Sequence, residues 1–129
     1  MKVIAAALLC VAAIVPHAWG QEVTPAERLS AWKHTKETTT DSIALFQAST
    51  ICHVIDHTTA ANAMAGLIAD ARTFKLIAGL EESQLQDILR EGLRKGEARA
   101  TPALCVWLHD QPKKMVYIKL QARLLAMHR

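Results

Sequence analysis

The chain has 129 residues and a formal net charge of +3, from 15 Lys and Arg against 12 Asp and Glu. These charges are spread along the chain, so the sequence shows no electrostatic footprint for nucleic acid. It also contains no internal repeat, low-complexity tract or long Gly/Pro/Ser linker. Length and composition therefore predict one domain and exclude a nucleic-acid-binding protein of the usual basic type.

The first twenty residues have the pattern of a cleavable secretory signal peptide. Lys2 precedes an unbroken apolar run over 3–15. The small residues Ala18 and Gly20 then stand at the −3 and −1 positions of a cleavage point before Gln21. A membrane anchor is the alternative, but this apolar run is shorter than the ~20 residues that cross a bilayer. We expect residues 1–20 to be removed.

The mature chain expected after cleavage, 21–129, is an exported protein of the periplasm or the extracellular space. Lipoprotein processing at Cys10 is not expected, because Leu9 stands where a small residue is required. The first twenty residues hold Lys2 and no acidic residue, so the mature chain keeps a charge of +2. No later segment has the length and hydrophobicity of a membrane span.

Two cysteines remain after cleavage, Cys52 and Cys105. An even pair in an oxidising compartment favours a disulfide over free thiols or a thiolate metal site. On the chain-entropy model, a bridge closing a loop of this length adds roughly 4 kcal/mol to stability. The sequence therefore predicts a Cys52–Cys105 disulfide as a main source of stability in so small a domain.

Helix signals begin directly after the predicted cleavage point. Thr24 to Glu27 has the pattern of a capping box with proline at the first helical position. The β-branched run at 38–40 is expected to weaken this helix, with Asp41 capping a restart. Apolar residues at helical spacing then predict a second helix over 42–57.

The remaining sequence continues as helices. Periodicity predicts a helix over 60–78 with Gly79 as its cap, and another over 83–95 ending near Gly96. Thr101 and Pro102 then indicate a new helix start, and the last helix is expected over 113–128, with a short strand at 115–118 as the alternative. The fold class is all-α: a small compact bundle of about four to six helices with one disulfide.

Apolar residues on these helices define the expected core. We also expect Trp32 and Trp107 to be buried, because such large rings dominate small cores. The predicted inward-facing residues are Leu29, Ile43, Phe46, Ile51, Val54, Ile55, Met64, Leu67, Ile68, Ala71, Phe74, Leu85, Ile88, Leu89, Leu93, Leu104, Leu108, Met115, Ile118, Ala122 and Leu125.

Histidines around the cysteines form the candidate metal site. His53 and His57 are four residues apart on the predicted 42–57 helix, which would place both imidazoles on one face. Such a pair can chelate a divalent ion, and His109 is the best third ligand because the disulfide brings it close. Asp56, His34 and His128 are the other candidates. The alternative is a set of surface histidines beside a structural disulfide.

The sequence offers no catalytic constellation. The serines lack a nucleophile-elbow pattern, the glycines form no phosphate loop, and the cysteines lack CxxC spacing. We therefore expect a non-catalytic protein, without a resident cofactor, that contacts another protein as an inhibitor, immunity factor or stress chaperone. The layout is similar to that of acid-stress periplasmic chaperones and small immunity proteins, a likeness that transfers no residue. A metal- or small-ligand-binding protein using His53 and His57 is the alternative.

Overall fold

The computed structural model describes residues 23–78 and 81–129. Residues 1–20, where the signal peptide is predicted, and the predicted cap Gly79 lie outside the described residues. By its internal contacts the chain divides into the units Met1–Trp32 and Lys33–Arg129. The prediction of one domain over 21–129 stays a prediction.

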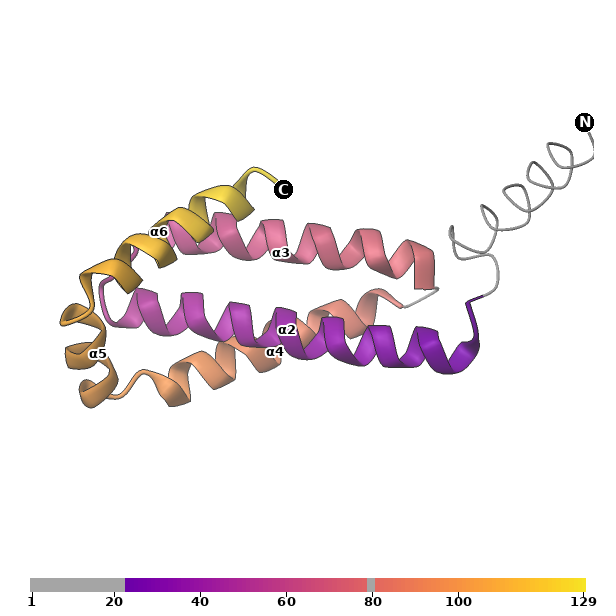
Figure 1. Cartoon of the computed structure of the whole chain (residues 1–129), viewed down its shortest axis with the longest axis horizontal. Coiled ribbons are helices and arrows are strands. Elements are labelled where there is room, and N and C mark those ends of the chain that lie inside the picture. Colours follow the sequence, from indigo (N-terminus) through magenta and orange to yellow (C-terminus); the bar gives the residue numbers. More distant parts are fainter. Residues whose placement is uncertain (1–22, 79–80) are drawn as a thin grey trace, which may run out of the picture. The chain divides into compact units, whose positions relative to one another are not determined.

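The described residues form helices α2 (Pro25–Ile51), α3 (His57–Ala78), α4 (Glu82–Arg99), α5 (Pro102–His109) and α6 (Pro112–Ala126), shown in Figure 1. No strand occurs among them. The all-α prediction, with four to six helices and one disulfide, is confirmed. The strand alternative at 115–118 is wrong, because these residues lie within α6. None of the described helices is long and apolar enough to cross a membrane.

Helix α2 begins at the predicted capping box. The Thr24 amide donates to Glu27 Oε2 at 3.2 Å, and the Glu27 amide donates to Thr24 Oγ1 at 3.1 Å. These reciprocal bonds satisfy two amides that have no partner inside the helix. The sequence therefore determines this helix start locally.

The predicted interruption of α2 at residues 38–40 is wrong. The helix continues to Ile51. Thr39 and Thr40 are buried, so packing outweighs the weak helix propensity of β-branched residues. The hydroxyl of Thr38 donates to the His34 carbonyl at 2.8 Å, one turn earlier, and is thus satisfied within the helix.

Two glycines allow α2 and α4 to pack closely. A side-chain carbon added to Gly92 would lie 2.6 Å from Cγ2 of Ile43, and one added to Gly96 would lie 2.5 Å from Cβ of Gln47. Ile43 and then Gln47 of α2 contact Gly92 and then Gly96 of α4, in the same order along the chain, so the two helices run parallel. The predicted end of α4 near Gly96 is wrong, because the helix continues through this buried glycine to Arg99.

Helix α6 packs along α3 in the same way. A side-chain carbon at Gly66 would overlap the backbone carbonyl of Leu125. Figure 1 shows α6 returning from α5 to lie along α3. The Thr101 side chain caps α5 by accepting from the Leu104 amide at 3.2 Å, and proline follows at the first helical position as predicted.

The predicted core is largely confirmed. Two of the predicted inward residues are exposed, Leu29 at 67% and Ile51 at 38%; the others with a described side chain are buried or half-buried. Trp32 is buried, as expected, but Trp107 is 44% exposed. Successive helical residues are about 100° apart, so Trp107 lies about 200° around α5 from Cys105. Cys105 faces the end of α2, and Trp107 therefore faces solvent.

Candidate functional site

The predicted disulfide is present. Cys52 and Cys105 are joined with an S–S distance of 2.05 Å and Cα atoms 4.9 Å apart. Cys52 directly follows α2, and Cys105 lies in the first turn of α5. The bridge therefore fixes the short helix α5 against the end of α2.

His109 strengthens the same junction. Its Nε2 atom lies 2.7 Å from the carbonyl oxygen of Cys52, so the ring donates a hydrogen bond from this nitrogen. Cys105 and His109 are one turn apart on α5, and both engage Cys52, one through sulfur and the other through the backbone. As predicted from the sequence, the disulfide brings His109 close to the segment around Cys52. The hydrogen bond to the Cys52 carbonyl gives this histidine a structural role.

His53 terminates α2 instead of lying within a helix. The His53 amide donates to the Thr50 carbonyl at 3.1 Å, and the Val54 amide donates to the Ser49 carbonyl at 2.8 Å. This pair of bonds is a Schellman motif, which requires a left-handed residue after the helix, and His53 has φ of 61°. The predicted helix over 42–57 is therefore wrong at its end. Glycine usually occupies such a position, and its absence concealed the helix end in the sequence.

The next helix starts at Asp56 and His57. The Thr59 amide donates to Asp56 Oδ1 at 2.6 Å, which caps α3. This hydrogen bond lowers the pKa of Asp56 below its ordinary value of 3.8. The helices predicted over 42–57 and 60–78 leave the break between them at 58–59, whereas the structure places the break at residues 52–56, between Ile51 and His57.

The geometric premise of the predicted metal site is therefore absent. His53 and His57 belong to different local structures, the end of α2 and the start of α3, and share no helical face. Among the described residues, no group of three or more His, Cys, Asp and Glu side chains lies close enough to hold one ion. The other candidate ligand His128 pairs with Asp70 at 2.8 Å. Metal binding by His53, His57 and His109 stays a prediction.

Helix α6 has apolar residues on two sides. Ile118 and Ala122 are buried, and Met115 and Leu125 are half-buried, so these residues form the side packed into the bundle. The other side spans roughly 100° of the helix by its geometry. It carries the exposed residues Val116, Tyr117, Leu120 and Leu124, and the exposed Met127 directly after the helix continues it; these five residues are hereafter the outer α6 stripe.

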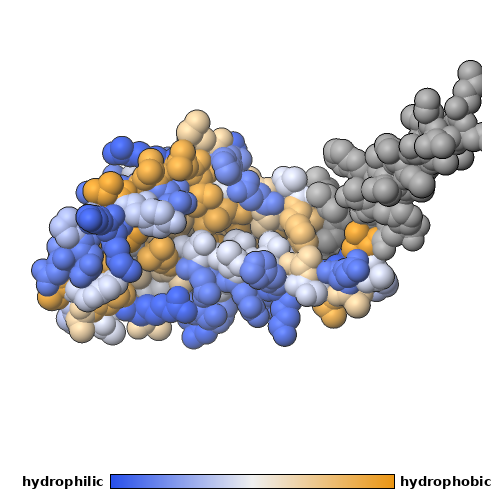
Figure 2. Space-filling model, in the orientation of Figure 1, coloured by the Kyte–Doolittle hydropathy of each residue, from blue (hydrophilic) through white to orange (hydrophobic). Residues whose placement is uncertain are grey.

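The outer α6 stripe is the largest group of exposed apolar side chains on any one described helix. Val116 is 66% exposed and Met127 is 79% exposed. On α5, Val106 and Trp107 are also exposed. Figure 2 shows hydrophobic residues interspersed with hydrophilic ones over the part of the molecule where α6 lies. Sequence reasoning missed this stripe because it recorded only the inward-facing periodicity of the helix.

Basic side chains accompany the stripe. Lys119 and Arg123 lie along one edge of the outer α6 stripe. They line a hollow of about 280 Å³ together with Asp56 and Thr59. The ammonium group of Lys114 lies 4.8 Å from the ring centre of Trp107, a cation–π contact between α6 and α5. This end of the molecule therefore combines apolar surface with positive charge.

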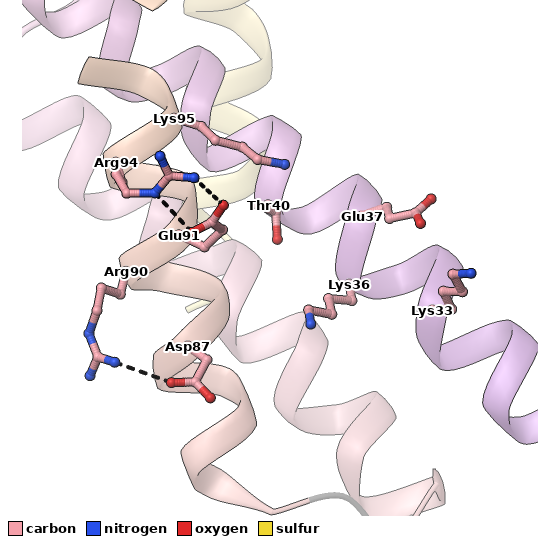
Figure 3. A pocket seen from close by; sticks show the side chains of 9 residues that line it. All are labelled: Lys33, Lys36, Glu37, Thr40, Asp87, Arg90, Glu91, Arg94 and Lys95. Carbon is pink, nitrogen blue, oxygen red and sulfur yellow. Dashed lines mark hydrogen bonds and ion pairs between the residues drawn. The ribbon is translucent and has the colours of Figure 1, made fainter. Parts of the chain in front are cut away.

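A second hollow lies between α2 and α4 (Figure 3) and has a volume of about 580 Å³. Arg94 forms two hydrogen bonds with Glu91, at 2.6 and 3.1 Å, and lowers the pKa of this carboxyl. Arg90 contacts Asp87 at 3.3 Å. Figure 3 shows Glu37 and Lys33 directed away from α4. Cations and carboxylates alternate here, and the hollow has the character of a solvated helix face.

No known protein family, curated protein or solved structure matches this chain.

Proposed function

We propose that this protein is exported and acts without catalysis by binding another protein, as an inhibitor, immunity factor or chaperone. The observation that carries the proposal is the outer α6 stripe. A helix of a small bundle normally has one apolar side, which faces the core, and a polar side, which faces water. Helix α6 has apolar residues on both sides, and a cluster of exposed apolar residues is typical of interaction sites.

The composition of this surface supports binding to a protein. Tyrosine, methionine, tryptophan and arginine are enriched at protein interfaces. Trp107 is exposed on α5, and Tyr117 and Met127 are exposed in the outer α6 stripe, with Arg123 at its edge. The apolar residues can supply the desolvated centre of an interface, and the basic residues can supply its polar rim.

The export part of the proposal is supported by the residue pattern at 1–20 and by the Cys52–Cys105 bridge. Structural disulfides persist in oxidising compartments and are rare in the reducing cytosol. The measurement is the intact mass of the protein recovered after export. We expect the mass of a chain starting at Gln21 with one disulfide. A mass that includes Met1, or a lipid on Cys10, would contradict this part.

Site-specific photo-crosslinking in living cells tests the contact. A photoreactive amino acid at Leu120 should give a discrete covalent adduct with a second protein. The matched control places the same group at Gln86, an exposed position on α4. The proposal also requires that Leu124→Gln abolish the Leu120 adduct, because the two side chains belong to one surface. Equal adducts at Leu120 and Gln86, or a Leu120 adduct unaffected by Leu124→Gln, would contradict it.

A further inference from the structure

The charge of the C-terminal segment restricts the chemistry of the partner. Residues 111–129 contain no Asp or Glu. Apart from histidine, the charged residues of the segment are Lys113, Lys114, Lys119, Arg123 and Arg129. The whole chain carries a net charge of only +3, so the positive charge is concentrated in this segment. The segment contains the helix with the exposed apolar stripe.

These cations are placed to meet charges on a partner. With about 100° per residue, Lys113 falls within the arc of the outer α6 stripe, and Lys119 and Arg123 fall along its edge. None of these three side chains forms an ion pair with a described residue. On α4, in contrast, Arg90 and Arg94 pair with carboxylates of their own helix, and Arg99 pairs with Asp41 of α2.

We infer, building on the proposed protein-contact function, that the outer α6 stripe binds an acidic amphipathic helix of a partner protein. The apolar residues of that helix would pack on Val116, Leu120 and Leu124, with Asp and Glu beside Lys113, Lys119 and Arg123. The stripe extends from Val116 to Met127, about 16 Å at 1.5 Å per residue, which corresponds to about three turns of a partner helix.

A second copy of this chain fits the surface poorly. Two outer α6 stripes packed on one another would bring two sets of basic residues together with no carboxylate between them, and like charges at an interface oppose association. A partner bearing carboxylates removes this repulsion and accelerates association through electrostatic attraction.

A flat anionic membrane also fits less well than a helix. Asp56 lies in the hollow beside Lys119 and Arg123, and Asp70 pairs with His128 near the other end of α6. A broad anionic surface would meet these exposed carboxylates together with the basic residues. A helix is narrow enough to lie on α6 alone, where the charge is entirely positive.

The test uses three synthetic 15-residue peptides with the same leucine stripe and with Glu, Gln or Lys at the flanking positions. Their binding to the purified protein is measured by fluorescence anisotropy at 50 and 300 mM NaCl. We expect the Glu peptide to bind at least tenfold more tightly than the Gln peptide and to lose this advantage at 300 mM NaCl, because salt screens exposed charges. The Lys peptide should not bind.

Paired variants locate the binding site. Leu120→Gln should abolish binding of the Glu peptide, whereas the control Leu45→Gln changes an exposed leucine of α2 and should not. Lys119→Glu combined with Arg123→Glu should weaken binding at least tenfold, and so should Lys113→Glu alone. The matched control, Lys33→Glu with Lys36→Glu, makes the same change in net charge as the double variant and should leave binding unchanged. Circular dichroism checks that each variant is folded.

Four outcomes overturn the inference. They are equal binding of the Glu and Gln peptides, no binding of any peptide at 1 mM, self-association of the protein that Leu120→Gln abolishes, and tighter binding to phosphatidylglycerol vesicles than to the Glu peptide. The first leaves protein contact in place and removes only its acidic character. If no peptide binds, the independent crosslinking result at Leu120 shows whether the proposed function also fails.

Discussion

Helices α4 and α6 have similar inner sides and very different outer sides. The inner side of α4 contains Leu85 and Ile88, both fully buried, and the inner side of α6 contains Ile118 and Ala122. On the outer side, α4 exposes mostly charged residues, some joined by i,i+3 ion pairs, whereas α6 exposes four large apolar residues and Met127 directly after it exposes a fifth. Core packing explains both inner sides, and contact with water explains the charged outer side of α4, but neither explains the apolar outer side of α6, on which the proposed function rests.

The largest effect should come from the disulfide, which connects the end of α2 to α5 and so to the start of α6. Replacing both cysteines by serine should lower the free energy of unfolding by about 4 kcal/mol, because a loop of this length regains its freedom in the unfolded chain. Urea denaturation gives this difference. A loss below about 1 kcal/mol would show that packing alone holds α5 in place.

A pair of leucine substitutions compares the inner and outer sides directly. Leu85→Ala on α4 should cost about 3 kcal/mol, because it removes a fully buried side chain and leaves a cavity. Leu120→Ala on α6 should cost less than about 0.5 kcal/mol, since a surface position makes few contacts. Equal losses in urea denaturation would mean that the outer α6 stripe is packed in solution, and would remove it as a binding surface.

Glycine substitutions compare the two helix contacts. Gly66→Ala should lower stability by about 2 kcal/mol, because the new methyl group meets the backbone of Leu125 and must push α6 from α3. Gly92→Ala should cost less, because it first meets the Ile43 side chain. Thermal unfolding measures both. A larger loss for Gly92→Ala would show that the contact between α2 and α4 is the tighter one.

His53→Gly should raise stability by about 0.5 kcal/mol. The histidine has φ of 61°, a conformation that glycine adopts without steric cost. The measurement is urea denaturation beside a His57→Gly control, which should be destabilising because His57 lies in the first turn of α3. A loss of stability for His53→Gly would indicate that its imidazole makes a stabilising contact.

The smallest effect concerns pH and the Asp56 cap. The Thr59 amide lowers the pKa of Asp56 in the folded state, so the unfolded chain binds the proton more readily. The cap therefore contributes fully above the ordinary pKa of 3.8, and its contribution is lost as pH falls through the lower folded-state value. Wild type and Asp56→Asn should differ in melting temperature at pH 6, and this difference should shrink at pH 2. A constant difference would contradict this linkage.

The local sequence was sufficient wherever the signals are short-range. The capping box at Thr24 and the proline start of α5 were both predicted from a few neighbouring residues, and both are present. The disulfide was predicted because only Cys52 and Cys105 remain after the expected cleavage. The inner sides of the helices were predicted because core packing requires helical periodicity.

The sequence interpretation failed where distant residues outweigh local preference. Helix α2 continues through 38–40 because Thr39 and Thr40 are buried, and α4 continues through Gly96 because a glycine there permits close contact with α2. Local propensities contain no information about either partner helix. The same limitation gave the wrong end for α2, where His53 takes a left-handed conformation that the sequence does not mark.

The sequence by itself determined the helical class, the inner sides of the helices and the cysteine pair, because periodicity and composition express these features directly. The tertiary structure decided which apolar residues remain outside: Trp107 on α5 and the outer stripe of α6. The physical reason is that a helix with apolar residues on two sides can bury only one of them in a bundle of this size. Which side is buried depends on the Gly66–Leu125 contact and on the disulfide that positions α5.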